Sequence, residues 1–184
     1  MRPGTIASFF LIIFGLMEFF LRQGRTAKSL KPGAKDQGTT LLIVTSYILA
    51  VIALSIDLPG YVWFEGLRWV GVGCAFLGTL LRIWSMKVLG SYYTCTLVTT
   101  SEQRVIQHSP YRFIRHPGYL AALLIWVGAA VASGSVTATF VVLALLIIAY
   151  GYRIKNEERM LVESLGTEYS DYRTRTWRLF PFIY

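Results

Sequence analysis

The sequence has little cysteine, little charge and long stretches without any charged residue. Cys74 and Cys95 are its only cysteines, and without close spacing or a second pair they support neither a disulfide framework nor a zinc site. Charged residues make up 15% of the 184 residues and hydrophobic residues 54%, with a mean hydropathy of +0.51. A soluble domain of this composition would expose a largely apolar surface. The composition therefore predicts one all-α integral membrane domain.

Acidic residues are also scarce, with 10 of them against 18 lysines and arginines, which gives a net charge of +8. An excess of this size can indicate nucleic-acid binding, but that activity needs a basic face or a separate basic domain. Here the basic residues flank apolar runs instead. They are better explained as signals that orient the chain in a membrane.

The apolar runs predict about five transmembrane helices. The first run is followed by Arg22, Arg25 and further lysines and no small-residue cleavage site, so we expect a retained anchor and not a signal peptide. The last run, 119–152, has no charge and is too long for one straight crossing, so two spans joined at Ser133-Gly134-Ser135 are expected. The predicted spans lie within 5–21, 39–56, 67–81 and the two halves of 119–152.

The distribution of positive charge predicts the orientation. The connections 22–38, 82–118 and 153–184 are rich in lysine and arginine, whereas 57–66 and 133–135 contain none. Positively charged connections stay on the cytoplasmic side. We therefore expect the N-terminus outside, and the C-terminus and both polar patches of the second half in the cytoplasm.

Polar and small residues within the spans have plain structural explanations. The Gly71-Val72-Gly73 run has no preceding strand, so it fails as a nucleotide-binding loop. Gly71, Ala75 and Gly78 are better explained as small residues that let two helices approach closely. Glu18 is expected to lie near the interface and to pair with a nearby lysine or arginine.

Two polar patches lie at either end of the uncharged 119–152 run. In the first patch, His116-Pro117 has the pattern of a helix start, where free backbone N–H groups can bind a ligand. In the second, Arg153 and Glu157 are four residues apart and share one helix face. If the run crosses the membrane twice, both patches lie on the same side, and we expect them to form one site.

Several separated motifs resemble the isoprenylcysteine carboxyl methyltransferase family and its bacterial and archaeal relatives. The resemblance covers residues 88–184, and one departure is Ser109, where many relatives have glycine. It divides the single domain 1–184 into a three-span part, 1–87, and a catalytic half, 88–184. The motifs, in order, are Ser109-Pro110-Tyr111, Arg115-His116-Pro117-Gly118-Tyr119, Arg153 with Glu157-Glu158, Leu165-Gly166 with Tyr169 and Tyr172, and Pro181-Phe182-Ile183.

The resemblance implies a membrane methyltransferase that uses S-adenosylmethionine. It implies that Arg153 and Glu157 are catalytic and that Arg153 also binds the acceptor; no metal site is predicted. The acceptor would be a prenylated or other lipophilic molecule that enters from the bilayer. The implied cofactor-binding residues are Gln103, Arg104, Val105, Ile106, Tyr111, His116, Pro117, Gly118, Tyr119 and Glu157.

The residue types suit this chemistry. An acceptor carboxylate is already ionised at neutral pH and needs no general base. Arg153 could hold it through two parallel hydrogen bonds, and Glu157 would complement the ammonium group or ribose hydroxyls of the cofactor. Tyr111 and Tyr119 could pack near the adenine or the sulfonium.

Other functions remain open on the sequence alone. Phospholipid N-methylation would need a general base such as His116 or Glu157. Sterol reductases that use reduced nicotinamide have a similar C-terminal half, although they are longer. A nucleophilic Cys95 helped by His108 or His116, or a non-enzymatic membrane protein such as a small transporter or assembly factor, are further alternatives.

Overall fold

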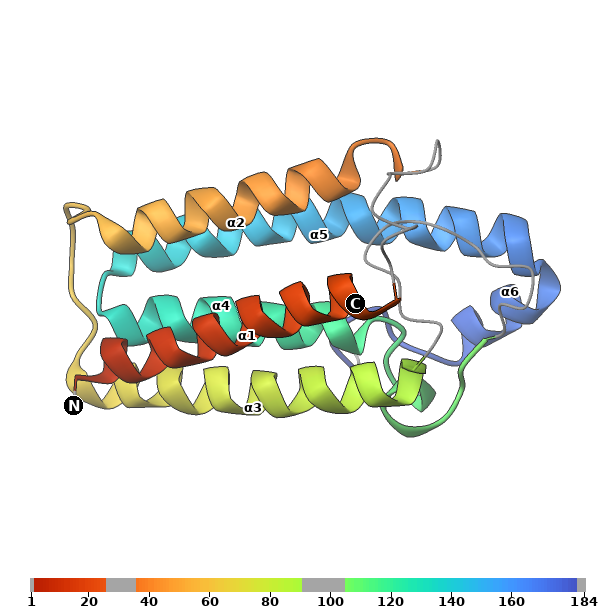
Figure 1. Cartoon of the computed structure of the whole chain (residues 1–184), viewed down its shortest axis with the longest axis horizontal. Helices are drawn as coiled ribbons and strands as arrows, with labels where there is room; N and C mark the ends of the chain where they lie inside the picture. Colours follow the sequence, from red (N-terminus) through yellow and green to blue (C-terminus); the bar gives the residue numbers. More distant parts are fainter. Residues whose placement is uncertain (1, 26–35, 91–104, 182–184) are drawn as a thin grey trace.

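The computed structural model describes residues 2–25, 36–90 and 105–181. Six α-helices and one short 3₁₀-helix are assigned in these ranges, and Figure 1 shows their arrangement. The helices are α1 (Pro3–Arg25), α2 (Thr39–Ser55), α3 (Glu65–Leu89), η3 (Ser109–Arg112), α4 (Pro117–Ser133), α5 (Val136–Leu165) and α6 (Thr167–Thr174).

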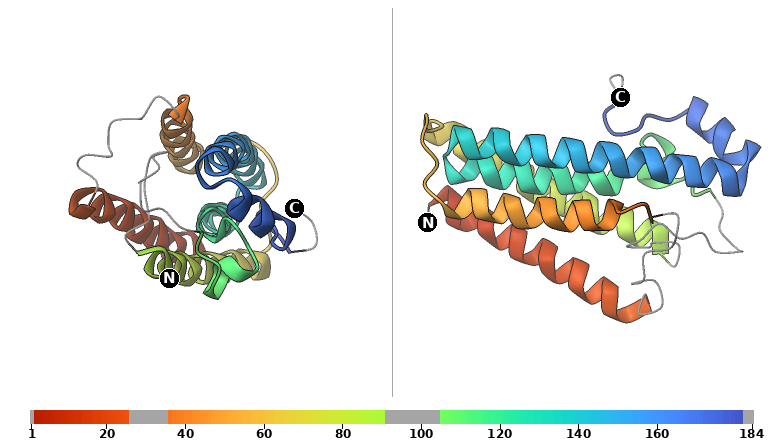
Figure 2. Two further views of the ribbon diagram at one scale, coloured as in Figure 1. Left: turned by 90° about the vertical axis from the view of Figure 1, so that its right-hand side faces the viewer. Right: turned by 90° about the horizontal axis from the view of Figure 1, so that it is seen from above.

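Five long helices run side by side, and the last of them extends beyond the others (Figures 1 and 2). Helix α4 packs on α3, α1 and α5, while α2 packs mainly on α5. The α5 end that extends beyond the other helices is the end that the sequence predicts to lie in the cytoplasm. Both η3 and α6 lie at this end. The five helices match the five predicted spans in place and order.

The close packing of α3 on α4 confirms the role predicted for the small residues of α3. A Cβ atom added to Gly71 would lie 2.6 Å from the carbonyl oxygen of Gly128, and one added to Gly78 would lie 2.8 Å from that of Ala121. Ala75 is fully buried in the same contact. Small residues therefore set the distance between these two helices.

The turn between α4 and α5 also lies where the sequence predicts it. Helix α4 ends at Ser133, Gly134 follows with φ of 104°, and the Ser135 hydroxyl accepts a hydrogen bond from the Ala138 N–H as the cap of α5. Trp63 N–H donates to the Gly134 carbonyl at 2.8 Å. The α2–α3 and α4–α5 connections therefore meet at one end of the bundle, opposite η3 and α6.

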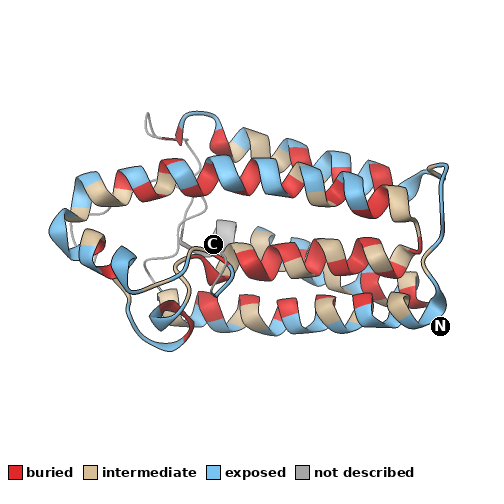
Figure 3. Ribbon diagram, turned by 180° about the vertical axis from the view of Figure 1, so that it is seen from behind, coloured by how far each residue is buried: buried red, intermediate tan, exposed pale blue. Residues whose placement is uncertain are grey.

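Many large apolar side chains are exposed on the helices, as a membrane protein requires, and Figure 3 shows that each long helix has exposed positions along its length. Exposed large side chains include Phe9, Leu41, Ile52, Leu77 and Ile148. Residues 3–20 of α1, all of α3 and all of α5 are long and apolar enough to cross a bilayer. Helices α2 and α4 are apolar but have 17 residues, about 26 Å each. The count of five crossings stays a prediction.

Helix α3 is longer than the sequence analysis predicts, because that analysis ends the span at Leu81 and the helix continues to Leu89. The charge of Arg82 suggested the end of the buried segment, but Arg82 is itself buried and so is Ser85. Arg82 pairs with Glu18 of α1 and donates from Nη1 to the Gly118 carbonyl at 2.8 Å. The extra turns of α3 thus support the first turn of α4.

The Glu18–Arg82 pair confirms that Glu18 has a cationic partner. This partner belongs to α3, 64 residues further along the chain. A Cβ atom at Gly118 would lie 2.9 Å from the Arg82 Nη1 atom. Glycine at position 118 therefore leaves the space that this arginine occupies.

Candidate active site

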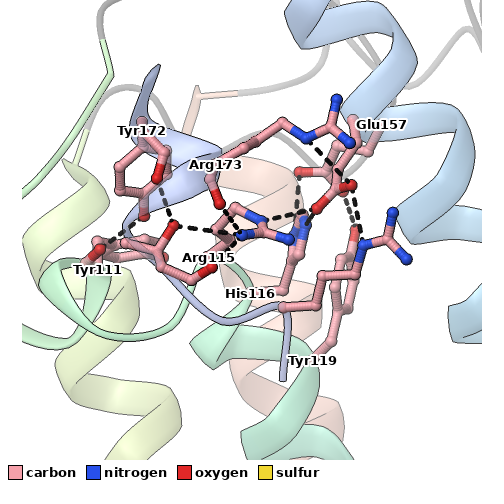
Figure 4. A network of polar contacts seen from close by, with 10 residues as sticks. Tyr111, Arg115, His116, Tyr119, Glu157, Tyr172 and Arg173 are labelled. Carbon is pink, nitrogen blue, oxygen red and sulfur yellow. Dashed lines mark hydrogen bonds and ion pairs between the residues drawn. The ribbon is translucent and has the colours of Figure 1, made fainter. Parts of the chain in front are cut away.

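The two polar patches predicted to meet do lie together. His116 precedes the first residue of α4, and Glu157 lies on the part of α5 that extends past the bundle; the His116 Nδ1 and Glu157 Oε1 atoms are 4.0 Å apart. Figure 4 shows His116, Glu157, Arg115 and Tyr119 clustered at this end of the molecule. The hairpin of α4 and α5 brings them there because its turn is at the opposite end.

A buried carboxylate, Glu158, holds this end together. Its Oε1 atom accepts a hydrogen bond from Arg115 Nε at 2.8 Å and lies 3.3 Å from His116 Nε2. Its Oε2 atom accepts from Arg178 Nε at 3.0 Å, and Arg173 lies 3.8 Å away. The carboxylate thus joins α4, α5 and the segment after α6.

The surroundings of Glu158 keep it ionised. Burial by itself would raise the pKa of this carboxyl, but the hydrogen bond with His116 and the ion pair with Arg115 outweigh burial and lower the pKa to about 2. Glu158 is therefore charged throughout the physiological range. Three arginines and His116 therefore already occupy both of its oxygens.

Backbone hydrogen bonds reinforce the same junction. Arg115 N–H donates to the Trp177 carbonyl at 2.7 Å, Trp177 N–H donates to the Phe113 carbonyl at 2.9 Å, and His116 N–H donates to the Arg178 carbonyl at 3.1 Å. The Arg115 guanidinium also donates to the carbonyls of Arg173 and Thr176. The residues after α6 are thereby fixed against the start of α4.

Glu157 differs from its neighbour because its side chain is 25% exposed and that of Glu158 only 4%. The Tyr119 hydroxyl donates to Glu157 Oε2 at 2.6 Å. The same hydroxyl accepts a hydrogen bond from Arg153 Nε at 3.1 Å, so its single proton is directed to Glu157. Arg153, Tyr119 and Glu157 form one chain of hydrogen bonds, with Glu157 at its accessible end.

Arg153 is more enclosed than the sequence suggests. The sequence places it at the cytosolic end of a span, ready for an acceptor, whereas the structure buries it and bonds its Nη1 atom to Asp36 Oδ1 at 2.7 Å and to Thr39 Oγ1 at 2.6 Å. Because two of its nitrogens already have protein partners, a bidentate contact to an acceptor through these atoms would require Asp36 or Tyr119 to move.

Tyr111 belongs to η3, and its side chain is buried and does not lie on an open surface. Its ring is buried, its hydroxyl approaches the Ser85 carbonyl at 3.4 Å, and its own carbonyl accepts a hydrogen bond from the Tyr172 hydroxyl at 2.6 Å. Burial raises the pKa of Tyr111, which keeps the phenol neutral. In this structure Tyr111 fastens η3 to α3 and α6.

Ser109 occupies a turn whose backbone conformation favours glycine. Its φ angle is 55°, in the left-handed region that glycine adopts at no steric cost. The turn therefore has the conformation that glycine favours although serine occupies it. Pro110 follows at the start of η3 and is buried.

The remaining predicted cofactor residues are only partly visible. Val105 and Ile106 are half-buried and precede η3, and Pro117 is buried at the start of α4. Gln103, Arg104 and Cys95 lie outside the described residues.

Several side chains that contribute to this site were not predicted from the sequence. Asp36, Arg82 and Arg115 were not assigned a role, and Glu158 was noted only as an additional polar group. One available signal was the aspartate just before an uncharged span, since aspartate is favoured at helix starts. Its partner could not be found in this way, because 117 positions separate Asp36 from Arg153.

The fold and site define an integral membrane protein of apolar helices with a buried ionic cluster at one end, in which the Glu157 carboxylate is partly accessible. The model of the isoprenylcysteine carboxyl methyltransferase (ICMT) family matches residues 70–163. The chain belongs to this family, and it is a membrane methyltransferase.

Named relatives are similar over most of their length. A probable protein-S-isoprenylcysteine O-methyltransferase of Oryza sativa subsp. indica is 30% identical over 155 residues, with 79% of this chain and 81% of the relative covered. Protein-S-isoprenylcysteine O-methyltransferase B of Arabidopsis thaliana is 26% identical over 183 residues, with 94% of this chain and 90% of the relative covered.

A solved structure shares the fold. The eukaryotic intramembrane Ras methyltransferase ICMT superposes with a TM-score of 0.68 at 20% identity, covering all of this chain and 68% of that one. The likeness spans the helices of both parts of the chain, including α1 and α2, which lie before the residues matched by the family model.

Proposed function

We propose that this protein transfers the methyl group of S-adenosylmethionine to the carboxylate of a prenylated cysteine or a similar lipophilic acceptor at the cytoplasmic face of the membrane. The acceptor is suggested by the names of the relatives. The observation that carries the site assignment is the accessible Glu157 carboxylate beside His116, linked through Tyr119 to Arg153.

The residues at the site fit the charge of the cofactor. S-adenosylmethionine is a cation at its sulfonium and ammonium groups and supplies a methyl group when bound. Of the two adjacent glutamates, Glu158 is paired with arginines and also contacts His116, whereas Glu157 keeps an exposed portion. Glu157 is thus the carboxylate able to attract a cationic ligand, and His116, Pro117, Gly118 and Tyr119 line the adjoining first turn of α4.

The other residues serve the site in different ways under this proposal. Val105 and Ile106 supply half-buried apolar surface before η3, and Gln103 and Arg104 precede them in the same predicted stretch. Tyr111 acts through the loop that it anchors and not by stacking, because its ring is buried. These assignments extend the roles that the family resemblance implies.

The acceptor side is assigned to Arg153. A carboxylate acceptor needs orientation and exclusion of water more than proton transfer, and a buried cation beside Tyr119 and Glu157 supplies attraction for it. The two candidate bases for an amine acceptor already have protein partners, because Glu157 accepts a hydrogen bond from Tyr119 and His116 contacts Glu158. The arrangement therefore favours a carboxylate acceptor over an amine.

The orientation in the membrane forms part of the proposal. The lysine- and arginine-rich connections would lie in the cytoplasm with the site, and the N-terminus would lie outside. The described parts of those connections, including η3 and α6, lie at the same end of the bundle. The α2–α3 and α4–α5 turns, which lack lysine and arginine, lie at the other end.

The test is a methyl-transfer assay with purified protein, S-adenosylmethionine, and either N-acetyl-S-farnesylcysteine or phosphatidylethanolamine. We expect transfer to the first and none to the second. Transfer to the lipid amine alone would overturn the assignment of acceptor. Calorimetric titration with S-adenosylhomocysteine tests the cofactor independently, and Glu157→Gln should weaken that binding at least tenfold.

Arg153 is best replaced by another cationic residue, because a neutral side chain at this position would leave Asp36 buried without a counter-ion. Arg153→Lys keeps the charge and loses the planar fork. We expect this variant to bind S-adenosylhomocysteine within threefold of the wild type and to lose at least tenfold in transfer. Full activity would remove Arg153 from the mechanism.

A further inference from the structure

Asp36 belongs to the part of the chain that precedes the family match, yet it reaches the candidate site. It lies three residues before Thr39, the first residue of α2, and it is buried with 1% of its surface exposed. The family model begins at residue 70, so the motifs of the second half give no account of this carboxylate.

Both oxygens of Asp36 are fixed by α2. Oδ2 accepts from the Thr40 N–H at 3.1 Å, and Oδ1 accepts from the hydroxyls of Thr39 at 3.0 Å and Thr40 at 2.8 Å. Burial by itself would raise the pKa of Asp36, but these hydrogen bonds and the charge of Arg153 lower it overall. Asp36 is therefore a rigid, ionised carboxylate.

The fixed carboxylate receives Arg153. Besides the 2.7 Å contact with Asp36, the Arg153 Nη1 atom lies 2.6 Å from Thr39 Oγ1 and 3.1 Å from Thr40 Oγ1. This nitrogen is enclosed by three oxygens from one turn of chain. With Nη1 fixed there, the guanidinium presents Nε to the Tyr119 hydroxyl, which in turn donates to Glu157.

Helix capping alone does not require the charge. Asparagine, serine and threonine satisfy free N–H groups at a helix start about as well as aspartate does. The charge of the carboxylate adds a modest attraction to the helix dipole at the start of α2, and it also strengthens the hydrogen bond to the cationic Arg153, because a charge-assisted hydrogen bond is shorter and stronger than a neutral one. The charge of Asp36 therefore serves Arg153 in addition to the start of α2.

We propose that Asp36 is a positioning residue of the methyl-transfer site, which holds the Arg153 guanidinium in the orientation that the acceptor carboxylate meets. The inference rests on the proposed function, in which Arg153 faces the acceptor. Both parts of the chain then contribute to the site, because Asp36, which precedes α2 in the N-terminal part, is the counter-ion of Arg153 in the catalytic half. Loss of this charge frees the guanidinium to turn toward Glu157.

The kinetic test compares Asp36→Asn, which retains a capping side chain, with Asp36→Glu, which retains the charge. We expect Asp36→Asn to lower kcat/KM for N-acetyl-S-farnesylcysteine at least tenfold while the Kd for S-adenosylhomocysteine stays within threefold, and Asp36→Glu to recover part of the loss. Asp57→Asn is the control, because Asp57 is exposed beyond the other end of α2, and it should match the wild type.

Wild-type kinetics in Asp36→Asn would overturn the proposal. So would equal losses of cofactor binding and transfer with no recovery in Asp36→Glu, since these describe a scaffold residue. If Asp36→Asn does not yield folded protein, Thr39→Ala removes a hydroxyl that contacts both Asp36 and Arg153 while leaving both charges. It should lower kcat/KM in the same direction by a smaller factor, and no change would refute the idea.

A measurement without turnover separates this inference from the proposed function. In protein labelled with ¹⁵N-arginine, the Arg153 Nε–H signal is identified by its loss in Arg153→Lys, and its exchange with water is measured. We expect exchange at least tenfold faster in Asp36→Asn than in the wild type. Unchanged exchange would refute positioning by Asp36, whereas a wild-type protein inactive on the prenylated acceptor would refute only the proposed function.

Discussion

Replacement of Glu158 by glutamine should release the segment after α6 from the start of α4. The substitution keeps the shape of the side chain and removes the charge that Arg115, His116 and Arg178 share. Arg115 is nearly as buried as Glu158, with 8% and 4% of the side chains exposed. The variant would therefore leave a buried guanidinium without its carboxylate.

The size of the effect follows from the pKa of Glu158. A shift from 4.5 to about 2 corresponds to about 3 kcal/mol of stabilisation by the ionised form. Loss of one partner of a buried ion pair costs a similar 3–5 kcal/mol, roughly, in other proteins. Arg178 is 32% exposed and its share is smaller because water screens it. We therefore expect a loss of about 3 kcal/mol.

Amide hydrogen exchange measures this loss where it occurs. The N–H groups of Arg115, His116 and Trp177 donate across the junction, so they exchange when it opens. A loss of about 3 kcal/mol speeds their exchange about a hundredfold. Glu168→Gln is the control, because Glu168 is exposed in the first turn of α6, and its effect should stay below about 1 kcal/mol. Exchange within threefold of the wild type in Glu158→Gln would refute the reasoning.

The stabilisation of the folded protein by Glu158 should also depend on pH, and it should decrease as the pH falls. Because the pKa of Glu158 is lowered in the folded protein, its contribution is present above pH 4.5 and is lost as the pH falls toward 2. Thermal unfolding in detergent should show a difference between the wild type and Glu158→Gln at pH 6 that shrinks progressively below pH 4.5. Parallel curves across this range would contradict the assigned pKa.

Three further substitutions test other contacts. Tyr119→Phe removes the link between Arg153 and Glu157 and should weaken S-adenosylhomocysteine binding by about 1–2 kcal/mol in a calorimetric titration. Gly118→Ala crowds the Arg82 guanidinium and should lower stability in thermal unfolding by about 1–3 kcal/mol, whereas Gly151→Ala, with open space around it, should not lower it. Ser109→Gly should raise stability by about 0.5 kcal/mol, because φ is 55° there; a lower melting temperature would contradict this.

The sequence predicted the parts of the fold that depend on local patterns. The apolar runs predicted the five long helices, and the Ser133-Gly134-Ser135 turn follows from glycine and a capping serine. Small residues gave the α3–α4 contact. The proximity of His116 and Glu157 could also be predicted, because a hairpin of two helices returns the chain to the side on which it began.

The partners of buried charges could not be predicted in the same way. Arg82 was interpreted as the end of a span because charge in hydrocarbon is costly, yet Glu18 and the Gly118 carbonyl receive it. Glu157 and Glu158 look alike in sequence, and their exposure separates them in space. Such pairings depend on how helices pack, which a single sequence does not state.

The two glutamates show how the site divides its charges. Glu158 and Asp36 are ionised, buried and matched to the arginines Arg115 and Arg153, so they fix the geometry without attracting a ligand. Glu157 shares its hydrogen bond with a neutral tyrosine and keeps an exposed portion. Within the cluster of Glu157, Glu158, His116, Arg115 and Arg153, a cationic ligand therefore meets one carboxylate that is not paired with an arginine, and the selectivity of the site for a cation depends on that imbalance.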